Sequence, residues 1–209
     1  MVEYLLGEEE MKKAINSQGC LGHTPLHLAI LNSDTVKLLL RHGADMEAWD
    51  YFRMTPAHRA AFGGIQGLNP ESLRTLRDAG FDLSIRTRSG RTVLHYAAEF
   101  FQQQEAMEYL LKQPGVIVNA QDSEGVTPLA LAADRSPGPE REWMISLLLQ
   151  YGADLEMKDD SGKTPADKIR RGKPKSRDDN RKHLPWDYGG YVYWLEYLSD
   201  SEESEEDLE

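Results

Sequence analysis

The sequence contains one cysteine, Cys20, among 209 residues. A single thiol excludes a disulfide within the chain, and the lack of disulfides is typical of a reducing, intracellular compartment. Long apolar runs are also lacking, and none approaches the roughly 20 residues that a transmembrane helix needs. The apolar stretch within residues 1–7 is too short for a signal peptide and has acidic flanks. These absences predict a protein of the cytoplasm or nucleus with no membrane segment.

Basic residues are too few to balance the acidic ones. The chain has 24 lysines and arginines against 35 aspartates and glutamates, a formal net charge of −11. Such an excess argues against nucleic acid as the main partner, because the phosphate backbone repels it. Residues 168–182 are a local exception, with eight basic residues against two aspartates. This run is either a solvated linker or a nuclear import signal.

Catalytic signatures are lacking as well. The sequence has no H-E-x-x-H, no G-x-S-x-G, no Walker loop and no paired-cysteine metal site. The glycines of FGGIQG, residues 62–67, do not follow a buried strand, so they make a weak phosphate cradle. Cys20 has His23 nearby but no positioned base with an orienting partner. We therefore predict no catalytic residue, no metal ligand and no cofactor.

What the chain does contain is one short phrase in five copies. HTPLHLA at residue 23 is followed by MTPAHRA, RTVLHYA, VTPLALA and KTPADKI, and the steps between their threonines are 31, 37, 35 and 37 residues. A leucine-rich phrase such as VKLLLRHGAD, residues 36–45, follows the earlier copies. Threonine before proline is suited to starting a helix, and leucines such as Leu28 and Leu38 give each helix an apolar face for stacking.

These phrases, in this order and at this period, resemble the ankyrin repeat. The resemblance covers about residues 15–172 and implies an all-α solenoid of stacked helix-turn-helix units with β-turn fingers. The expected divisions are a partial N-terminal repeat or cap at 1–20, the repeat domain at 21–172, a basic linker at 173–183, an aromatic C-terminal cap at 184–198 and a disordered acidic tail at 199–209.

Three histidines, His27, His58 and His95, occupy the same position in the first three copies. The resemblance implies that each is a structural hydrogen-bonding element that ties neighbouring turns together. The alternative is a metal or catalytic cluster. Equivalent positions in stacked helices lie about 8–10 Å apart, whereas zinc holds nitrogen ligands at about 2.0–2.1 Å. Because three rings at that spacing do not share one ion, the structural role is favoured.

Ankyrin repeats usually bind partners along a concave face made of finger tips and first helices. The second finger, AWDYFRMTP at residues 48–56, departs from the family pattern because Arg53 stands where glycine is usual. Its clustered aromatics resemble an interface hot spot, unless the insertion in the same repeat covers them. The third finger adds Arg86 as part of a basic strip, or is merely solvated. The predicted partner-binding residues are Trp49, Tyr51, Phe52, Arg53, Met54, Phe62, Arg88, Arg91, Phe100, Glu124 and Arg135.

Insertions and the C-terminal segment depart from the repeat. Residues 63–72 and 134–142 are rich in glycine, proline and polar residues, which predicts surface loops. Residues 184–198 carry six of the chain's 18 aromatic residues, and they either cap the last repeat or fold over the groove to form a ligand pocket. The acidic tail contains Ser199 and Ser204, each followed by an acid three residues on, which resembles a site for acid-directed kinases.

The leading functional prediction is a monomeric, intracellular adaptor or regulatory subunit that binds another protein. The alternative is an enzyme, or an enzyme accessory, with a small-molecule pocket between the groove and the aromatic C-terminal segment. Its candidate groups are His58, Arg59, His95, Tyr96 and the tyrosines of the C-terminal segment, which would have to converge within hydrogen-bond reach. Fold alone does not choose a partner, so the partner's identity stays open.

Overall fold

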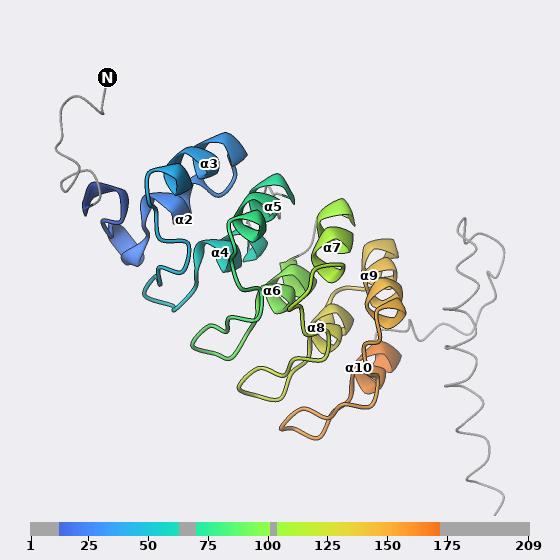
Figure 1. Cartoon of the computed structure of the whole chain (residues 1–209). Helices are drawn as coiled ribbons and strands as arrows, with labels where there is room; N and C mark the ends of the chain where they lie inside the picture. Colours follow the sequence, from blue (N-terminus) through green and yellow to red (C-terminus); the bar gives the residue numbers. More distant parts are fainter. Residues whose placement is uncertain (1–12, 63–69, 101–103, 172–209) are drawn as a thin grey trace, which may run out of the picture. The chain divides into compact units, whose positions relative to one another are not determined.

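The computed structural model describes residues 13–62, 70–100 and 104–171, and the structural statements below concern those residues. Two kinds of helix alternate along them (Figure 1). The first helices of the repeats are α2 Pro25–Ala29, α4 Pro56–Phe62, α6 Val93–Phe100, α8 Pro128–Asp134 and α10 Pro165–Arg171. The second helices are α3 Ser33–Arg41, α5 Pro70–Asp78, α7 Gln104–Leu111 and α9 Pro139–Gln150, and a 3-10 turn, η2, spans Cys20–Gly22. The described residues contain no strand, as the predicted all-α class requires.

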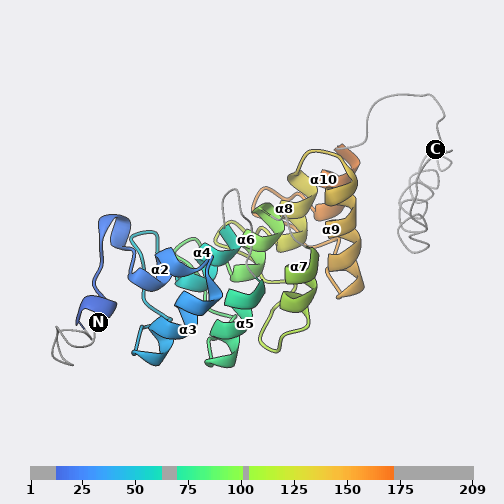
Figure 2. The same cartoon turned by 90° about the horizontal axis from the view of Figure 1, so that it is seen from above.

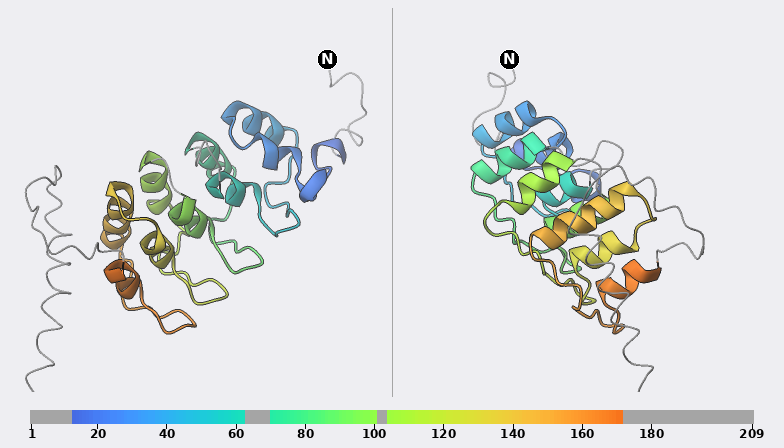
Figure 3. Two further views of the ribbon diagram at one scale, coloured as in Figure 1. Left: turned by 180° about the vertical axis from the view of Figure 1, so that it is seen from behind. Right: turned by 90° about the vertical axis from the view of Figure 1, so that its right-hand side faces the viewer.

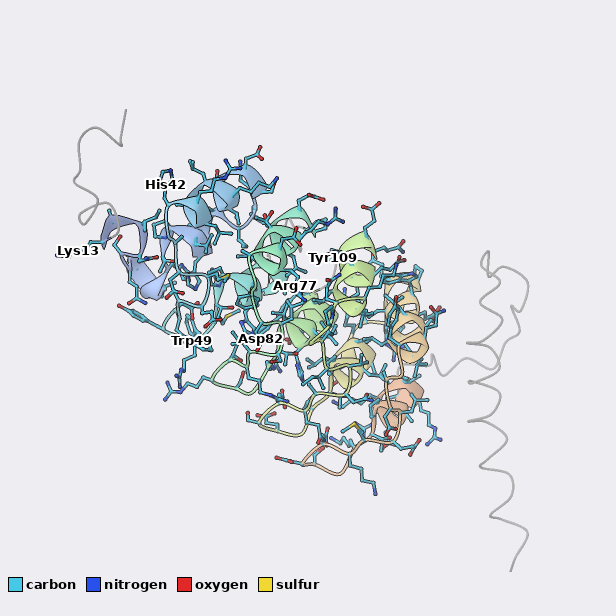
Figure 4. All side chains as sticks on the ribbon, viewed as in Figure 1. Lys13, His42, Trp49, Arg77, Asp82 and Tyr109 are labelled. Carbon is cyan, nitrogen blue, oxygen red and sulfur yellow. The ribbon has the colours of Figure 1, made fainter. Side chains whose placement is uncertain are left out.

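The first helices form one row and the second helices form another beside it (Figures 1 and 2). Along the first row α4 packs on α6, α6 on α8, and α8 on α10; along the second row α3 packs on α5, and α5 on α7. The guanidinium of Arg74 on α5 lies 5.0 Å from the ring centre of Tyr109 on α7; Tyr109 is labelled in Figure 4. A finger precedes each first helix, and the fingers project from one side of the stack (Figure 3).

Small side chains let the first helices approach one another. The alanine pairs at residues 60–61, 97–98 and 132–133 are all buried, as their repetition in the sequence predicts. Leucines fill the space between the rows, among them Leu26, Leu73, Leu94, Leu129 and Leu148. Burial of one such side chain contributes about 1.5–3 kcal/mol, so the interfaces between repeats supply most of the driving force for folding.

Two leucines expected to pack between repeats are exposed instead. Leu28 on α2 and Leu38 on α3 are 69% and 54% exposed, whereas the equivalent Leu131 and Leu147 of the fourth repeat are 9% and 7% exposed. In the fourth repeat these positions are covered by the stack around them. The first repeat begins the described stack, because residues 1–12 lie outside the described residues.

The insertion at residues 134–142 is only partly the surface loop that its composition predicts. Helix α9 already begins at Pro139, so the second half of the insertion is helical. Arg141 is buried in the first turn of α9, and its Nε and Nη2 donate to Ala133 O over 3.0 and 2.9 Å. The guanidinium thereby pairs a carbonyl at the end of α8 that the helix leaves without a partner. Composition alone did not indicate this role because arginine is ordinarily a surface residue.

The last three residues of the glycine-rich insertion, 70–72, are not the predicted loop, because they begin helix α5 at Pro70. Several other predictions fall on residues outside the described part of the chain. They concern the partial N-terminal repeat, the rest of that insertion, the basic linker, the aromatic cap and the acidic tail with Ser199 and Ser204, at residues 1–12, 63–69 and 172–209. These remain predictions.

Candidate functional site

The fingers are built alike, and they lie at residues 19–23, 50–54, 87–91, 122–126 and 159–163. In each finger the first backbone N–H donates to the last carbonyl over 2.8–3.0 Å. In the second, fourth and fifth fingers the first residue is an aspartate, Asp50, Asp122 or Asp159, and one of its carboxylate oxygens accepts two further backbone N–H groups. Aspartate commonly holds a turn in this way. The second finger therefore has an ordinary internal structure.

Neighbouring fingers are joined near their tips by one backbone hydrogen bond at three of the four junctions. The bonds run from Tyr51 N to Leu21 O (3.0 Å), from Ser123 N to Ser89 O (2.9 Å) and from Asp160 N to Glu124 O (2.9 Å). In each case the residue that follows the acceptor is a glycine with a φ of 74–76°: Gly22, Gly90 or Gly125.

Glycine at this position has a second reason beyond its backbone conformation. A Cβ added to Gly90 would lie 2.9 Å from Ser123 N, and one added to Gly125 would lie 3.1 Å from Asp160 N. Both distances are shorter than ordinary van der Waals contact, and the atoms met are backbone atoms that carry the junction. Only a residue without a Cβ lets the next finger come close enough to form its hydrogen bond.

Arg53 occupies the glycine position of the second finger, with a φ of 55°. Among the described residues no backbone hydrogen bond joins the second finger to the third. The bond absent here would run from Arg88 N to Phe52 O, by analogy with the other three junctions. A Cβ added to Gly90 or Gly125 would meet the backbone of the next finger, so by analogy we attribute the missing bond to the Cβ of Arg53. The row of backbone hydrogen bonds that joins the finger tips is therefore interrupted between the second and third fingers.

The side chains of the second finger divide between its surface and its base. Tyr51 and Phe52 are 67% and 57% exposed. Trp49 is half-buried, and the Arg53 guanidinium lies 5.3 Å from its ring centre (Figure 4). Met54 is only 5% exposed, so its side chain is part of the core and does not belong to the partner-binding set. Met54 has a structural role instead: its carbonyl accepts a hydrogen bond from His27 Nε2.

A second aromatic cluster lies where α4 and α6 run side by side. The ring centres of Phe62 and Phe100 are 4.7 Å apart, and Phe62 lies 6.0 Å from Tyr96 in an edge-to-face arrangement. Tyr96 is buried, whereas Phe62 and Phe100 are each 38% exposed. Edge-to-face pairs of this kind are favourable beyond the area they bury. We call Phe62, Tyr96 and Phe100 the helix-end cluster.

The arginines of the third finger do not form the continuous basic strip that the sequence suggested. Arg91 is paired with two carboxylates, Glu99 at 2.6 Å and Asp122 at 3.1 Å, so its charge is compensated. Arg86 donates to Gln121 O and therefore braces the fourth finger, although it keeps its charge. Arg88 is exposed at the tip of the finger. Only part of the expected strip is thus available to a partner.

Two further predicted site residues lie in the fourth repeat. Glu124 is exposed, and its carbonyl accepts the tip bond to the fifth finger. Arg135 is half-buried, and its Nη1 donates to Glu99 O over 3.2 Å, which places it beside the helix-end cluster of α6. The structure therefore brings Arg91 and Arg135 together around Glu99, and leaves Glu124 at the tip of its own finger.

The three equivalent histidines bond in a similar way, but His27 and His95 use the last carbonyl of the next finger, whereas His58 uses the carbonyl of Ile85 just before it. Nε2 of His27, His58 and His95 lies 3.0–3.1 Å from a carbonyl oxygen of the following finger region, Met54 O, Ile85 O and Val126 O respectively. A carbonyl only accepts, so Nε2 carries the proton and Nδ1 is an acceptor. Nδ1 meets the hydroxyl and the backbone N–H of the threonine three residues earlier, the hydroxyl at 2.8–2.9 Å. The predicted structural role is confirmed.

Burial affects the acid–base behaviour of these rings. It lowers the pKa of His58 and of His95 to about 4, and it also lowers the pKa of His27. The cause is the cost of a charged ring away from water. All three rings are therefore neutral at physiological pH, as their hydrogen-bond pattern requires.

The groups suggested for acid–base catalysis are occupied by the repeat structure. Both ring nitrogens of His58 and His95 are hydrogen-bonded, and both rings are inaccessible to solvent. Tyr96 is buried against Phe62, and Arg59 stands 5.7 Å from the Phe62 ring centre. Across residues 13–62, 70–100 and 104–171, no group of three or more His, Cys, Asp or Glu side chains is arranged to hold a metal ion.

Sequence reasoning missed how the last repeat replaces the histidine. Asp167 stands at the histidine position of that repeat, and its Oδ2 accepts the Thr164 N–H over 2.9 Å while Thr164 Oγ1 accepts the Asp167 N–H over 3.2 Å. This reciprocal pair is a capping box. The signal was present, because a threonine and an acid three residues later mark a helix start. Lys168, also missed, is buried and reaches Asp134 at 2.8 Å across to the fourth repeat.

Comparison with known proteins agrees with this architecture. The family model described as ankyrin repeats (3 copies) matches residues 1–87 and 65–159, which together make up most of the chain. The chain belongs to the ankyrin repeat family. Within that family it is 34% identical over 154 residues to the human B-cell lymphoma 3 protein, covering 69% of this chain and 32% of that protein.

Other ankyrin relatives have names that describe different activities. The E3 ubiquitin-protein ligase KEG of Arabidopsis thaliana is 30% identical, over 76% of this chain and 10% of its own length. The transient receptor potential cation channel subfamily A member 1 of Drosophila melanogaster is 32% identical, over 72% of this chain and 12% of its own length. This ankyrin chain spans about a third or less of these relatives.

Ankyrin repeats are protein–protein interaction modules, and the described residues include no helix long and apolar enough to cross a membrane.

Proposed function

We propose that this chain is an adaptor or regulatory subunit that binds another protein through its fingers and first helices. The proposal is supported mainly by the exposure of two aromatic side chains at the tip of the second finger. Tyr51 and Phe52 there are both more than half exposed. The corresponding tip residues of the third, fourth and fifth fingers are polar or charged: Arg88, Ser89, Ser123, Glu124, Asp160 and Ser161. The first finger adds one exposed apolar side chain, Leu21, at 52%. Two neighbouring aromatic side chains in solvent at the second finger favour a specific contact.

The energetic argument is that of an interface hot spot. Burying an aromatic side chain that is exposed in the free protein contributes about 1.5–3 kcal/mol, and aromatic residues with arginine dominate measured interface energies. Phe52 and Tyr51 stand beside Arg53, which supplies the arginine. The half-exposed rings of Phe62 and Phe100 offer a second apolar contact on the first-helix row. A partner that touches both surfaces would bury four aromatic rings.

Compartment and assembly belong to the same proposal. A reducing compartment, the cytoplasm or the nucleus, suits a chain with one cysteine, Cys20, which is exposed. We expect the free chain to be a monomer, since ankyrin repeats stack on their own neighbours and leave the partner surface to another protein.

The test is affinity capture from the native source with a paired set of variants. Tyr51→Ala/Phe52→Ala removes both exposed rings, while Ser123→Ala/Glu124→Ala changes the same two positions of the fourth finger. We expect partners captured by the wild type to be lost only with the first pair, by about tenfold or more for each hot-spot ring removed. Phe100→Ala should give a smaller loss.

Far-ultraviolet circular dichroism and the thermal midpoint would show that both double variants fold like the wild type, because all four side chains are exposed. If the two double variants and the wild type retain the same partners in equal amounts, the second finger is not the binding site.

A further inference from the structure

The junction between the second and third fingers leaves one backbone acceptor and one backbone donor unpaired in the described part of the chain. These are the Phe52 carbonyl and the Arg88 N–H, whose equivalents bond to each other at the other three junctions. We attribute this to the Cβ of Arg53, by analogy with Gly90 and Gly125, where an added Cβ would meet the backbone of the next finger. We call this unpaired carbonyl and N–H, at the tips of the second and third fingers, the tip notch. An unpaired carbonyl and N–H beside each other form a template for another extended backbone.

The charge around the tip notch is opposite to the charge of the whole chain. Residues 49–54 and 84–91 contain four arginines and a single acid, Asp50, whose side chain is fully buried. Of the four arginines, Arg91 is neutralised by its two carboxylates. No carboxylate among the described residues forms an ion pair with the remaining three: Arg53, Arg86 and Arg88. A local excess of positive charge therefore stands at the tips of a chain with a net charge of −11.

Exposed rings border the same notch. Tyr51 and Phe52 precede Arg53 in the second finger, and both reach solvent. In an extended segment successive side chains point to opposite sides, so a bound segment can place one side chain on the rings while its neighbours meet the guanidiniums. We infer that the tip notch binds an extended acidic segment of a partner protein, whose backbone pairs with Phe52 O and Arg88 N–H. This inference rests on the proposed function and names the chemistry of the partner.

The observations favour a peptide over a nucleic acid. An extended peptide carries N–H and C=O groups along both of its edges, so it can donate to Phe52 O and accept from the Arg88 N–H. A nucleic acid strand would offer phosphates to the arginines but no equivalent backbone pair for both groups. The chain's net charge of −11 would also repel a long polyanion, whereas a short acidic segment meets mainly the local charge.

The first measurement uses arrays of immobilised peptides of about eight residues, the length of an ordinary strand. One array carries several aspartates or glutamates per peptide, and the matched array has asparagine or glutamine at the same places. We expect the wild-type chain to bind the acidic array about tenfold more strongly than the amide array, because each ionic contact adds a modest increment. Equal binding to the two arrays, or stronger binding to an oligothymidine strand, overturns the inference.

Two substitutions at one position separate the notch from its charge. Arg53→Ala removes the guanidinium but keeps the Cβ, so the notch stays open. Arg53→Gly removes both, and the tip bond from Arg88 N to Phe52 O can form. We expect binding of the strongest acidic peptides to fall about threefold in Arg53→Ala, as for one exposed charge, and about a further tenfold or more in Arg53→Gly, where the backbone contacts are also lost. Equal losses in the two variants contradict the backbone contact.

Hydrogen exchange of the Arg88 amide provides a readout that does not depend on affinity. It should be unprotected in the free wild type, protected in the wild type with bound acidic peptide, and protected in free Arg53→Gly. Protection in the free wild type overturns the inference by itself. Failure of the acidic arrays while partner capture still depends on Tyr51 and Phe52 would overturn the inference and leave the proposed function standing. The reverse result would remove the proposed function alone.

Discussion

The junction between the second and third repeats is held at the opposite end from the junction between the fourth and fifth. At the former, His58 donates to Ile85 O at the base of the third finger, while in the described structure no backbone hydrogen bond joins the tips beside Arg53. At the latter the tips are joined through Asp160 N, while the histidine position is occupied by Ala130, which has no side-chain donor. Each junction keeps one of two ties.

The difference shows that the two ties are independent of each other. The tip bond requires a residue without a Cβ, and the base bond requires an imidazole. A substitution of the glycine removes only the tip bond, and a substitution of the histidine removes only the base bond. The fourth-to-fifth junction compensates at its base with other polar contacts. Gln121 Nε2 donates to Lys158 O over 3.0 Å, and the buried Lys168 ammonium meets Asp134. At the second-to-third junction no such contact compensates at the tips, and the carbonyl of Phe52 and the N–H of Arg88 stay unbonded in the described structure.

The largest effect should come from acid, which acts on the histidine ties alone. The folded-state pKa of His58 and of His95 is about 4, below the ordinary value of 6.5. Between these values the unfolded state binds protons that the folded state does not, so stability is complete above pH 6.5 and is lost as pH falls toward 4. From pH 7 to pH 5 we expect a loss of roughly 2 kcal/mol for each of the two rings. Urea unfolding at both pH values measures it.

The carboxylates of the last repeat provide a control within the same experiment. A side-chain hydrogen bond from Ser161 lowers the pKa of Asp159, and the backbone N–H of Thr164 lowers the pKa of Asp167, so both stay charged between pH 7 and pH 5. Hydrogen exchange should accordingly show earlier loss of protection at the histidine-tied junctions than around α10. A stability that is constant down to pH 5 would contradict the neutral, buried rings.

Removal of one histidine should break the second-to-third junction most severely. His58→Ala leaves the Ile85 carbonyl and the Thr55 N–H without their partner and opens a cavity, for an expected loss of about 3 kcal/mol in free energy of unfolding. His95→Ala makes the matched change at the third-to-fourth junction, which retains the tip bond to Ser123. Native-state hydrogen exchange should therefore show the larger local opening in His58→Ala. Equal opening in both variants would mean that the tip bond contributes nothing.

The role of the tip glycines can be tested with two alanines of equal backbone cost. Gly125 and Gly162 have φ values of 75° and 78°, but a Cβ on Gly125 would meet Asp160 N, while one on Gly162 would meet nothing within 4 Å. We expect Gly162→Ala to lose about 1 kcal/mol from its positive φ alone, and Gly125→Ala about 2 kcal/mol because the junction also suffers. Equal losses by chemical denaturation would remove the steric argument.

The smallest effect, and the only gain, is expected from Arg53→Gly. It relieves a positive φ in a residue with a side chain and lets the Arg88 N–H reach Phe52 O, at the expense of greater backbone freedom in the unfolded chain. The net result should be an increase of roughly 0.5–1 kcal/mol in free energy of unfolding. Arg53→Ala keeps the Cβ and should show no such gain. A gain of the same size in both variants would assign it to loss of positive charge.

Most of the fold could be predicted from the repeated phrase, because each copy specifies its own helix start, apolar face and finger. The candidate site was predictable in part. Arg53 stood out in a glycine position, yet its consequence at Phe52 and Arg88 depends on a neighbouring finger 35 residues away along the chain. The burial of Met54 and the pairing of Arg91 with Glu99 could not be read locally, since the partners come from other elements.

By itself, the amino-acid sequence determined which residues cap helices, which tolerate a positive φ and which lie on apolar faces, because these are properties of short segments. Only the tertiary structure decided which polar groups find partners: the carbonyls that accept from the histidines, the carboxylates that neutralise Arg91, and the carbonyl and N–H that stay unbonded beside Arg53. The physical reason is that a hydrogen bond or a steric clash depends on distances of a few ångströms between different repeats, and stacking alone sets those distances.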